Sequence, residues 1–110
     1  GIAVNISTSA SFFHSYHLAI SPDSDQVAYV ADITNGVGEL FRVPVEGGES
    51  VKLNPPPVNS LADVYDRYFE FSPNNACVVF IFSTGTSGQE LYSACEYNFD
   101  FAIYLPIIQK

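Results

Sequence analysis

Basic residues are scarce in this 110-residue chain, which holds four Lys and Arg against twelve Asp and Glu, for a net charge of −8. A protein that binds a phosphate backbone needs clustered cations to release the counterions of the nucleic acid. We therefore expect no nucleic-acid partner. The same shortage argues against binding to an anionic membrane surface. The acidic balance is interpreted as a contribution to solubility.

Long apolar runs and helical periodicity are also missing. No stretch reaches the ~18 apolar residues of a membrane helix, and no basic and apolar leader stands at the start. We expect no membrane insertion. The chain begins at Gly1, so we expect a mature fragment or a trimmed piece. No window of ten or more residues places its apolar residues 3.6 positions apart, so no helix is predicted.

Catalytic motifs are missing as well. The Gly-x-Ser-x-Gly motif of a nucleophile elbow does not occur. Residues 84–88 have the composition of a phosphate loop, but the Gly-Lys-Ser/Thr ending is absent and no helix follows. We interpret this segment as a hairpin loop. The sequence thus predicts neither an enzyme nor a cofactor.

The candidate metal ligands are few. His14 and His17 are the only histidines, and residues three apart in an extended segment point to opposite faces. A zinc site usually needs three or four ligands. Asp23 and Asp25, helped by Asp32, could offer oxygens to calcium, which takes six or more. Asp23 is better explained as the cap of its own turn, so no metal site is predicted.

Hydrophobic residues make up 47 % of the chain and charged residues 15 %, which excludes a disordered chain. Nine Phe and seven Tyr suit the half-buried surfaces of strands. Short apolar runs alternate with turn signals, and Pro106 marks the last strand as an edge strand. Strands are expected at residues 1–8, 16–20, 26–33, 39–45, 50–53, 67–71, 76–83, 89–97 and 101–108.

An internal repeat has an offset of 51 positions, since 72 − 21 and 90 − 39 give the same number. Between the anchors of the repeat, residues 27–31 align with residues 78–82 without a gap. Self-similarity at a fixed period is the sequence signature of repeat architectures. The anchors are Ser21-Pro22 with Ser72-Pro73, and Glu39-Leu40 with Glu90-Leu91.

Each repeat contains four short strands, which is typical of a β-propeller blade. One such sheet cannot cover both of its faces, so blades stack face to face. Residues 78–82 are all apolar, which predicts a strand covered on both sides. The predicted fold is all-β, an incomplete propeller of four-stranded antiparallel blades. Residues 1–8 would be a strand of a preceding blade, 16–53 the first blade, 54–66 a linker and 67–108 the second blade.

The repeat resembles that of the TolB-like propellers. The family pattern is a strand, Ser-Pro-Asp-Gly, a second strand, Glu-Leu-aromatic and a Gly-Gly turn. The first repeat has Ser21-Pro22-Asp23, Glu39-Leu40-Phe41 and Gly47-Gly48, with Ser24 where Gly is usual. The second repeat departs from the pattern, because Asn74-Asn75 replaces Asp-Gly and no Gly-Gly turn follows.

The resemblance implies a non-catalytic protein-interaction or scaffold module, in the periplasm or outside the cell. An alternative is the substrate-gating propeller of a prolyl-oligopeptidase-like serine hydrolase, and a third is a lectin-like oligomer. Two blades cannot close a ring. The expected partners are therefore another protein, further blades of the same propeller, or copies of the chain, for example three chains making six blades. The sequence does not identify ligand-binding residues.

Two further groups concern the second repeat. If the hairpin is symmetric about Thr86, Cys77 and Cys95 face each other, with Cβ atoms about 4.5–5.5 Å apart and close to disulfide reach. A cross-strand disulfide and two buried thiols both fit this placement. A group of four aromatic residues near the start of the second repeat is interpreted as core rather than as a binding surface. They are Tyr65, Tyr68, Phe69 and Phe71.

Overall fold

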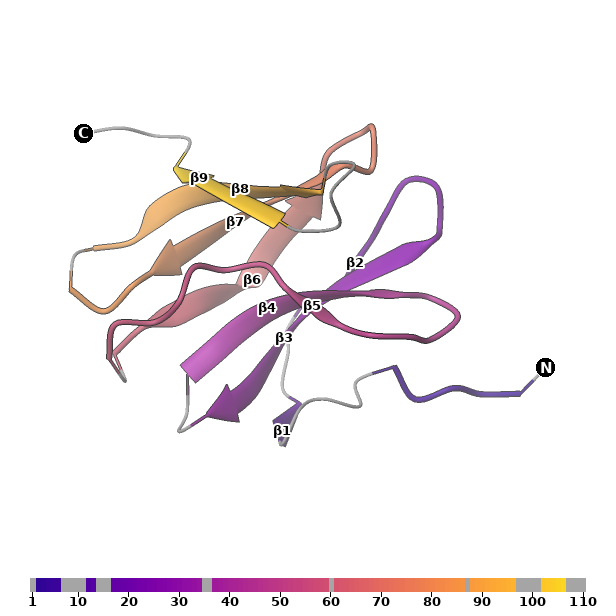
Figure 1. Cartoon of the computed structure of the whole chain (residues 1–110), viewed down its shortest axis with the longest axis horizontal. Helices are drawn as coiled ribbons and strands as arrows, with labels where there is room; N and C mark the ends of the chain where they lie inside the picture. The colour runs from indigo at the N-terminus through magenta and orange to yellow at the C-terminus, as the bar shows by residue number, and fades with distance from the viewer. Residues whose placement is uncertain are drawn as a thin grey trace.

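The computed structural model describes residues 2–6, 12–13, 17–34, 37–59, 61–86, 88–96 and 102–106. None of these residues is helical, and all strand pairs are antiparallel, so the predicted all-β class is confirmed (Figure 1). The strands are β1 (Phe12–Phe13), β2 (Ala19–Ile20), β3 (Gln26–Thr34), β4 (Val37–Pro44), β5 (Val51–Lys52), β6 (Asp63–Phe71), β7 (Cys77–Ser83), β8 (Glu90–Glu96) and β9 (Ala102–Pro106).

The strands form two sheets (Figure 1). The first sheet has the order β1-β3-β4-β5, with β2 also paired to β3, and the second has the order β6-β7-β8-β9. In the second sheet, neighbours in sequence are neighbours in space, and in the first sheet β1 and β2 both pair with β3. Strand β9 lies at an edge of its sheet, where Pro106 was predicted. An edge position suits proline because it has no N–H to give to a further strand.

The repeat extends further than the sequence predicted. Strands β1 and β2 together occupy the position that β6 holds in the second sheet. Phe12 is opposite Asp32 in the first sheet, and Asp63 is opposite Ser83 in the second. Each residue of the second pair is 51 positions after its equivalent in the first pair. The predicted linker 54–66 is therefore too long, because β6 begins at Asp63 and buries Val64.

The predicted strand at residues 1–8 is wrong for the residues that the structure describes, because residues 2–6 are in no strand. Ile6 instead packs against a cluster that contains Tyr29 and Phe41. A ladder needs a neighbouring strand edge, whereas Ile6 packs on a face of the first sheet and Ile2 and Val4 are exposed. Burial of Ile6 thus replaces strand pairing here.

The first sheet buries apolar residues on both of its faces. The two faces follow from the alternation of side chains along a strand. We call one the aliphatic face, because it contains Ala28, Val30 and Leu40. We call the other the aromatic face, because it contains Tyr29 and Phe41 beside Ala31 and Val43.

The second sheet covers the aliphatic face of the first with its own aromatic face. Strand β6 lies against β2, β3 and β4, and one apolar cluster joins the two sheets. Phe69, Phe80 and Phe82 are its largest fully buried side chains. The opposite face of the second sheet, which we also call aliphatic, contains Val79, Ile81 and Leu91, all partly exposed. The prediction that residues 78–82 are covered on both sides is therefore wrong, because among the described residues a sheet packs on one face of the second sheet and Val79 and Ile81 on the other face are partly exposed.

The two sheets thus pack by unlike faces. The offset of 51 equates Tyr29 with Phe80 and Val30 with Ile81, yet Phe80 and Val30 are the residues in the shared core. A sandwich related by a two-fold axis would bury the same face twice. Here one unit follows the other head to tail, which is the relation that generates rings or open arrays.

Candidate functional site

The first Ser-Pro turn is fixed by its own side chains. The Ser21 hydroxyl donates to Asp23 Oδ1 at 2.6 Å and accepts from the Gln26 N–H at 2.9 Å. The Asp25 N–H donates to the same carboxylate at 3.0 Å. These bonds, led by that from Ser21, hold the pKa of Asp23 below its ordinary value of 3.8. Ser24 takes the left-handed conformation, with φ of 67°, where the family pattern has Gly.

The second turn repeats this arrangement without a charge. The Ser72 hydroxyl donates to Asn74 Oδ1 at 2.6 Å and accepts from the Cys77 N–H at 3.0 Å. The Ala76 N–H donates to the Asn74 side chain at 3.1 Å, and Asn75 has φ of 67°. An amide oxygen therefore performs the same capping as the carboxylate of the first turn.

This equivalence gives a pH prediction for Asp23→Asn. A carboxylate whose pKa is lowered on folding stabilises the protein above its unfolded pKa, and this contribution is lost as the pH falls through the folded pKa. Asn keeps the acceptor and does not titrate. The Tm of the variant should therefore fall less than that of the wild type between about pH 6 and about pH 3, as measured by circular dichroism.

Asn74→Asp is the matched control, because it adds the titrating group to the other turn. It should make the Tm more sensitive to acid over the same range. If Asp23→Asn loses as much Tm on acidification as the wild type, the assignment of acid sensitivity to this turn is wrong.

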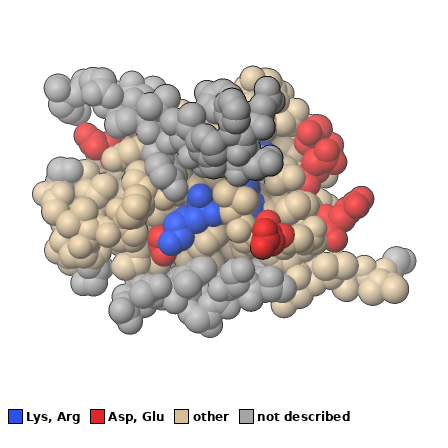
Figure 2. All heavy atoms as spheres, viewed as in Figure 1, with Lys and Arg blue, Asp and Glu red and all other residues tan. Residues whose placement is uncertain are grey.

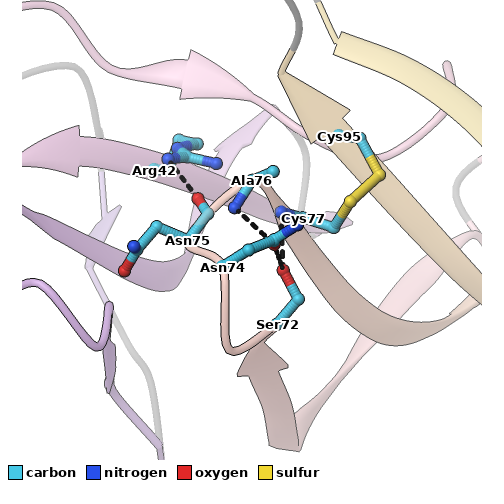
Figure 3. The surroundings of a disulfide bond; sticks show 7 residues. All are labelled: Arg42, Ser72, Asn74, Asn75, Ala76, Cys77 and Cys95. Carbon is cyan, nitrogen blue, oxygen red and sulfur yellow. Dashed lines mark hydrogen bonds between the residues drawn. A yellow bond between two sulfur atoms is a disulfide. The ribbon is translucent and has the colours of Figure 1, made fainter.

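The two turns meet between the sheets. The Asp23 N–H donates to Asn75 Oδ1 at 2.8 Å. Buried Arg42, from β4, donates through Nη2 to the Asn75 carbonyl at 3.3 Å, and its guanidinium lies 5.2 Å from the centre of the Phe71 ring (Figure 3). Nε of Arg42 also donates to Gln26 Oε1 at 3.5 Å. Arg42 thereby connects both units at the end of the core.

The predicted pairing of Cys77 with Cys95 is that of the structure. The two residues are opposite each other on β7 and β8, with Cα atoms 4.0 Å apart, and a disulfide joins them (Figure 3). In the first sheet the equivalent pair is Gln26 and Pro44. There the surface has a hollow of about 300 Å³, lined by Ser24, Asp25, Gln26, Pro44, Val45 and Glu46.

Asn54 and Glu39 form a buried polar group that the sequence did not reveal. Asn54 Oδ1 accepts from the Leu40 N–H at 2.8 Å, and Nδ2 donates to Glu39 Oε1 at 3.2 Å and to the Pro55 carbonyl at 2.9 Å. Lys52 pairs with the same Glu39 oxygen at 3.0 Å. Glu39 is one of the repeated residues, but a single Asn before a proline run carries no signal for its partner.

Glu90, the equivalent of Glu39, has a different role. It is half-buried and accepts from the Tyr92 hydroxyl at 3.4 Å. Burial, together with the Glu90 charge, raises the pKa of Tyr92 above its ordinary value of 10.0. Leu40 is fully buried between the sheets, whereas its equivalent Leu91 is partly exposed. The repeated Glu-Leu pair is thus kept in sequence while its surroundings differ.

The candidate metal ligands are used for other contacts. Nε2 of His17 donates to the Phe69 carbonyl at 3.0 Å, and its ring packs on the Phe69 and Tyr68 rings. His14 and the side chain of Asp32 lie outside the described residues. Within the described residues, no group of three His, Cys, Asp or Glu is placed to hold a metal ion.

The aromatic group predicted to be core is divided. Phe69 and Phe71 are buried, but Tyr65 and Tyr68 are 40 % and 50 % exposed, so the prediction is wrong for the two tyrosines. Their hydroxyls favour contact with water. The Tyr68 hydroxyl donates to Glu70 at 2.8 Å, and this bond raises the pKa of Tyr68.

The charged side chains form no further candidate site among the described residues. On the face in Figure 2, basic side chains form one small patch near the middle, with acidic side chains beside it and at the right-hand edge. Two of the four basic residues serve internal contacts, Arg42 between the turns and Lys52 with Glu39. The described part of the chain contains no helix that is long and apolar enough to cross a membrane.

The outer faces of the two sheets are the remaining candidate for binding. On the aromatic face of the first sheet, Leu18 and Ile20 are 57 % and 64 % exposed, whereas their equivalents Phe69 and Phe71 are 0 % and 7 % exposed. The aliphatic face of the second sheet is partly exposed. Neighbouring exposed apolar residues mark interaction surfaces more often than isolated ones do.

Comparison of the chain with protein-family models, with curated proteins and with solved structures gives no match.

Proposed function

We propose that this chain is a non-catalytic protein-interaction module made of two propeller-type blades of the TolB-like class. The observation that supports this proposal most directly is the packing by unlike faces. Two units with the same sequence pattern are related head to tail, so neither the aromatic face of the first unit nor the aliphatic face of the second is used in the contact between the sheets. The first of these faces is exposed at Leu18 and Ile20, and the second is partly exposed.

The two faces of a twisted four-stranded sheet explain why such units stack on one another. Each unit has two apolar faces but covers only one face of its neighbour, so every added unit covers one face and supplies another. Propellers solve this by radial repetition around an axis. The resemblance of the first repeat to the TolB-like pattern agrees with this arrangement.

The non-catalytic part of the proposal rests on how the reactive side chains are used. The Asp23 carboxylate caps a turn, His17 donates to a backbone carbonyl, and the two cysteines form a disulfide. Each of these groups has a structural role. The disulfide also supports a periplasmic or extracellular location, because disulfides persist in oxidising compartments.

A tandem fusion of two copies, joined by a flexible linker, tests this proposal. If the units stack in the propeller manner, the second sheet of the leading copy will cover the first sheet of the trailing copy. The linker holds the two faces at an effective concentration in the millimolar range. The fusion should therefore melt at a higher temperature than the single chain and have a more compact hydrodynamic radius than two separate domains.

The control fusion carries Leu91→Asp in the leading copy only. The charge lies on the face that would be covered, so the gain in Tm should be lost. If the unmodified fusion melts at the temperature of the single chain and is as extended as two unconnected domains, the propeller-type proposal is wrong.

A further inference from the structure

We infer that the chain binds a second copy of itself head to tail, with the aliphatic face of one copy's second sheet on the aromatic face of the other copy's first sheet. This inference rests on the proposed stacking of units, and it names the partner. It differs from the tandem experiment because separate chains must associate without a linker.

The contact inside the chain shows what such an interface contains. There, the small aliphatic residues of the first sheet meet the aromatic residues of the second. The two outer faces carry the equivalents of these residues, and on the aromatic face the exposed ones are Leu18 and Ile20. By the offset of 51, Val79, Ile81 and Leu91 are the equivalents of Ala28, Val30 and Leu40.

The aromatic face of the first sheet supplies the complementary surface. Leu18 and Ile20 are the equivalents of Phe69 and Phe71, which are covered by the neighbouring sheet. Ile20 is opposite Val27, and Val27 is opposite Val43, so an apolar row crosses this face from the exposed edge to the buried cluster. A second copy would cover the exposed end of the row.

The segment of residues 2–6 lies on the same face and competes with a second copy. Ile6 packs against the cluster of Tyr29 and Phe41, while Ile2 and Val4 are exposed. This segment belongs to no strand, so a docked sheet can take the place of Ile6 without breaking a ladder. Removal of this contact is a cost that weakens association.

Besides the loss of the Ile6 contact, the lack of an arginine at the position equivalent to Arg42 makes the interface between copies weaker than the one inside the chain. Arg42 connects the two units through Asn75 and Phe71. Its equivalent in the second sheet is Ser93, which cannot reach a neighbouring turn in the same way. The association of copies should therefore be reversible and should depend on concentration.

Sedimentation equilibrium at increasing concentration tests the inference with two variants. Ile20→Asp places a charge on the aromatic face, and Leu91→Asp places one on the aliphatic face. The wild type should increase in average mass beyond that of one chain as the concentration rises. Each variant alone should keep the mass of a monomer.

The mixture of the two variants is decisive. Each variant retains one intact face, and the two intact faces are complementary, so the mixture should form a complex of one chain of each kind and nothing larger. An interface between two like faces would behave differently, because one of the two variants would then still associate with itself.

Leu61→Asp is the control, since Leu61 is exposed and lies outside both faces. It should associate like the wild type. Far-UV circular dichroism and Tm establish that each variant is folded. Should Leu91→Asp fail to fold, Val79→Ser replaces it on the same face, with the same expected result.

Three results would overturn the inference: a wild type with the mass of one chain at every concentration, self-association of the Ile20→Asp variant at the wild-type level, or a mixture that remains monomeric. The tandem fusion separates the two proposals. If separate copies do not associate but the fusion gains Tm, only the inference of self-association fails. If neither occurs, the proposed stacking fails as well.

Discussion

Replacement of Phe69 by Ala is expected to lower the free energy of unfolding by about 3–5 kcal/mol, the usual range for removing a buried Phe. Phe69 is fully buried in the core between the two sheets, and its carbonyl accepts the hydrogen bond from His17. The substitution leaves a cavity where the aromatic face of the second sheet meets the first. Since a domain has only about 5–15 kcal/mol of stability, the loss should be a large part of the total.

The matched control is Leu18→Ala, at the equivalent position in the first unit. Leu18 is mostly exposed, so the change should cost less than about 0.5 kcal/mol, as surface substitutions do. Urea titrations followed by far-UV circular dichroism measure both values. If the two substitutions cost the same, the two sheets do not pack by unlike faces.

The repeat itself could be predicted from the sequence, because its signals are local. Ser21 and Ser72 cap turns with the same hydrogen bonds, and an offset of 51 relates every pair of these bonds. The register of Cys77 and Cys95 followed from the symmetry of one hairpin. Both features depend only on residues within one turn or one hairpin.

Burial by a neighbouring sheet could not be predicted in this way. Residues 27–31 and 78–82 have the same apolar pattern, but the first run is covered on both faces and the second on one. The local pattern is the same in both, and the difference comes from which unit has a neighbour. The same reason explains why Leu40 and Leu91 differ in exposure although both follow a repeated Glu.

The predicted start of the strand at residues 67–71 was wrong for a related reason. The sequence placed the end of the linker at residue 66, because a loop was expected to lead into a strand at residues 67–71. The structure begins β6 at Asp63, whose carboxylate accepts from the Gly38 N–H of β4 at 3.1 Å. The partner of Asp63 is 25 positions away in the sequence, so no local sequence signal predicts that this Asp belongs to a strand.

The division of roles between the two units bears on function. Arg42 and the polar group around Glu39 belong to the first unit, while the disulfide belongs to the second. Arg42 holds the internal contact together, whereas Glu39 and Lys52 lie on the same face of the first sheet as Phe41. A stack with one strong internal contact and two weaker outer faces suits a module that joins partners reversibly.

The polar group of the first unit gives the second large prediction. Asn54→Leu should lower the free energy of unfolding by about 2–4 kcal/mol, because an orphaned buried polar group costs about 1–3 kcal/mol and two groups lose a partner. The Leu40 N–H loses its acceptor, and Glu39 loses one of its two donors. Leu has the branching of Asn but is larger, so overpacking at this fully buried position adds to the loss.

Two further variants separate the hydrogen bonds from general effects of the substitution. Asn54→Asp retains the acceptor for the Leu40 N–H but places a second carboxylate beside Glu39. Like charges raise the pKa values of the pair on folding, so this variant should be destabilised at neutral pH and regain stability below about pH 4. Asn59→Ala removes an exposed Asn and should cost less than about 1 kcal/mol. Urea titrations at both pH values measure the three variants. If Asn54→Leu costs no more than Asn59→Ala, the buried amide does not hold β4 and the segment after β5 together.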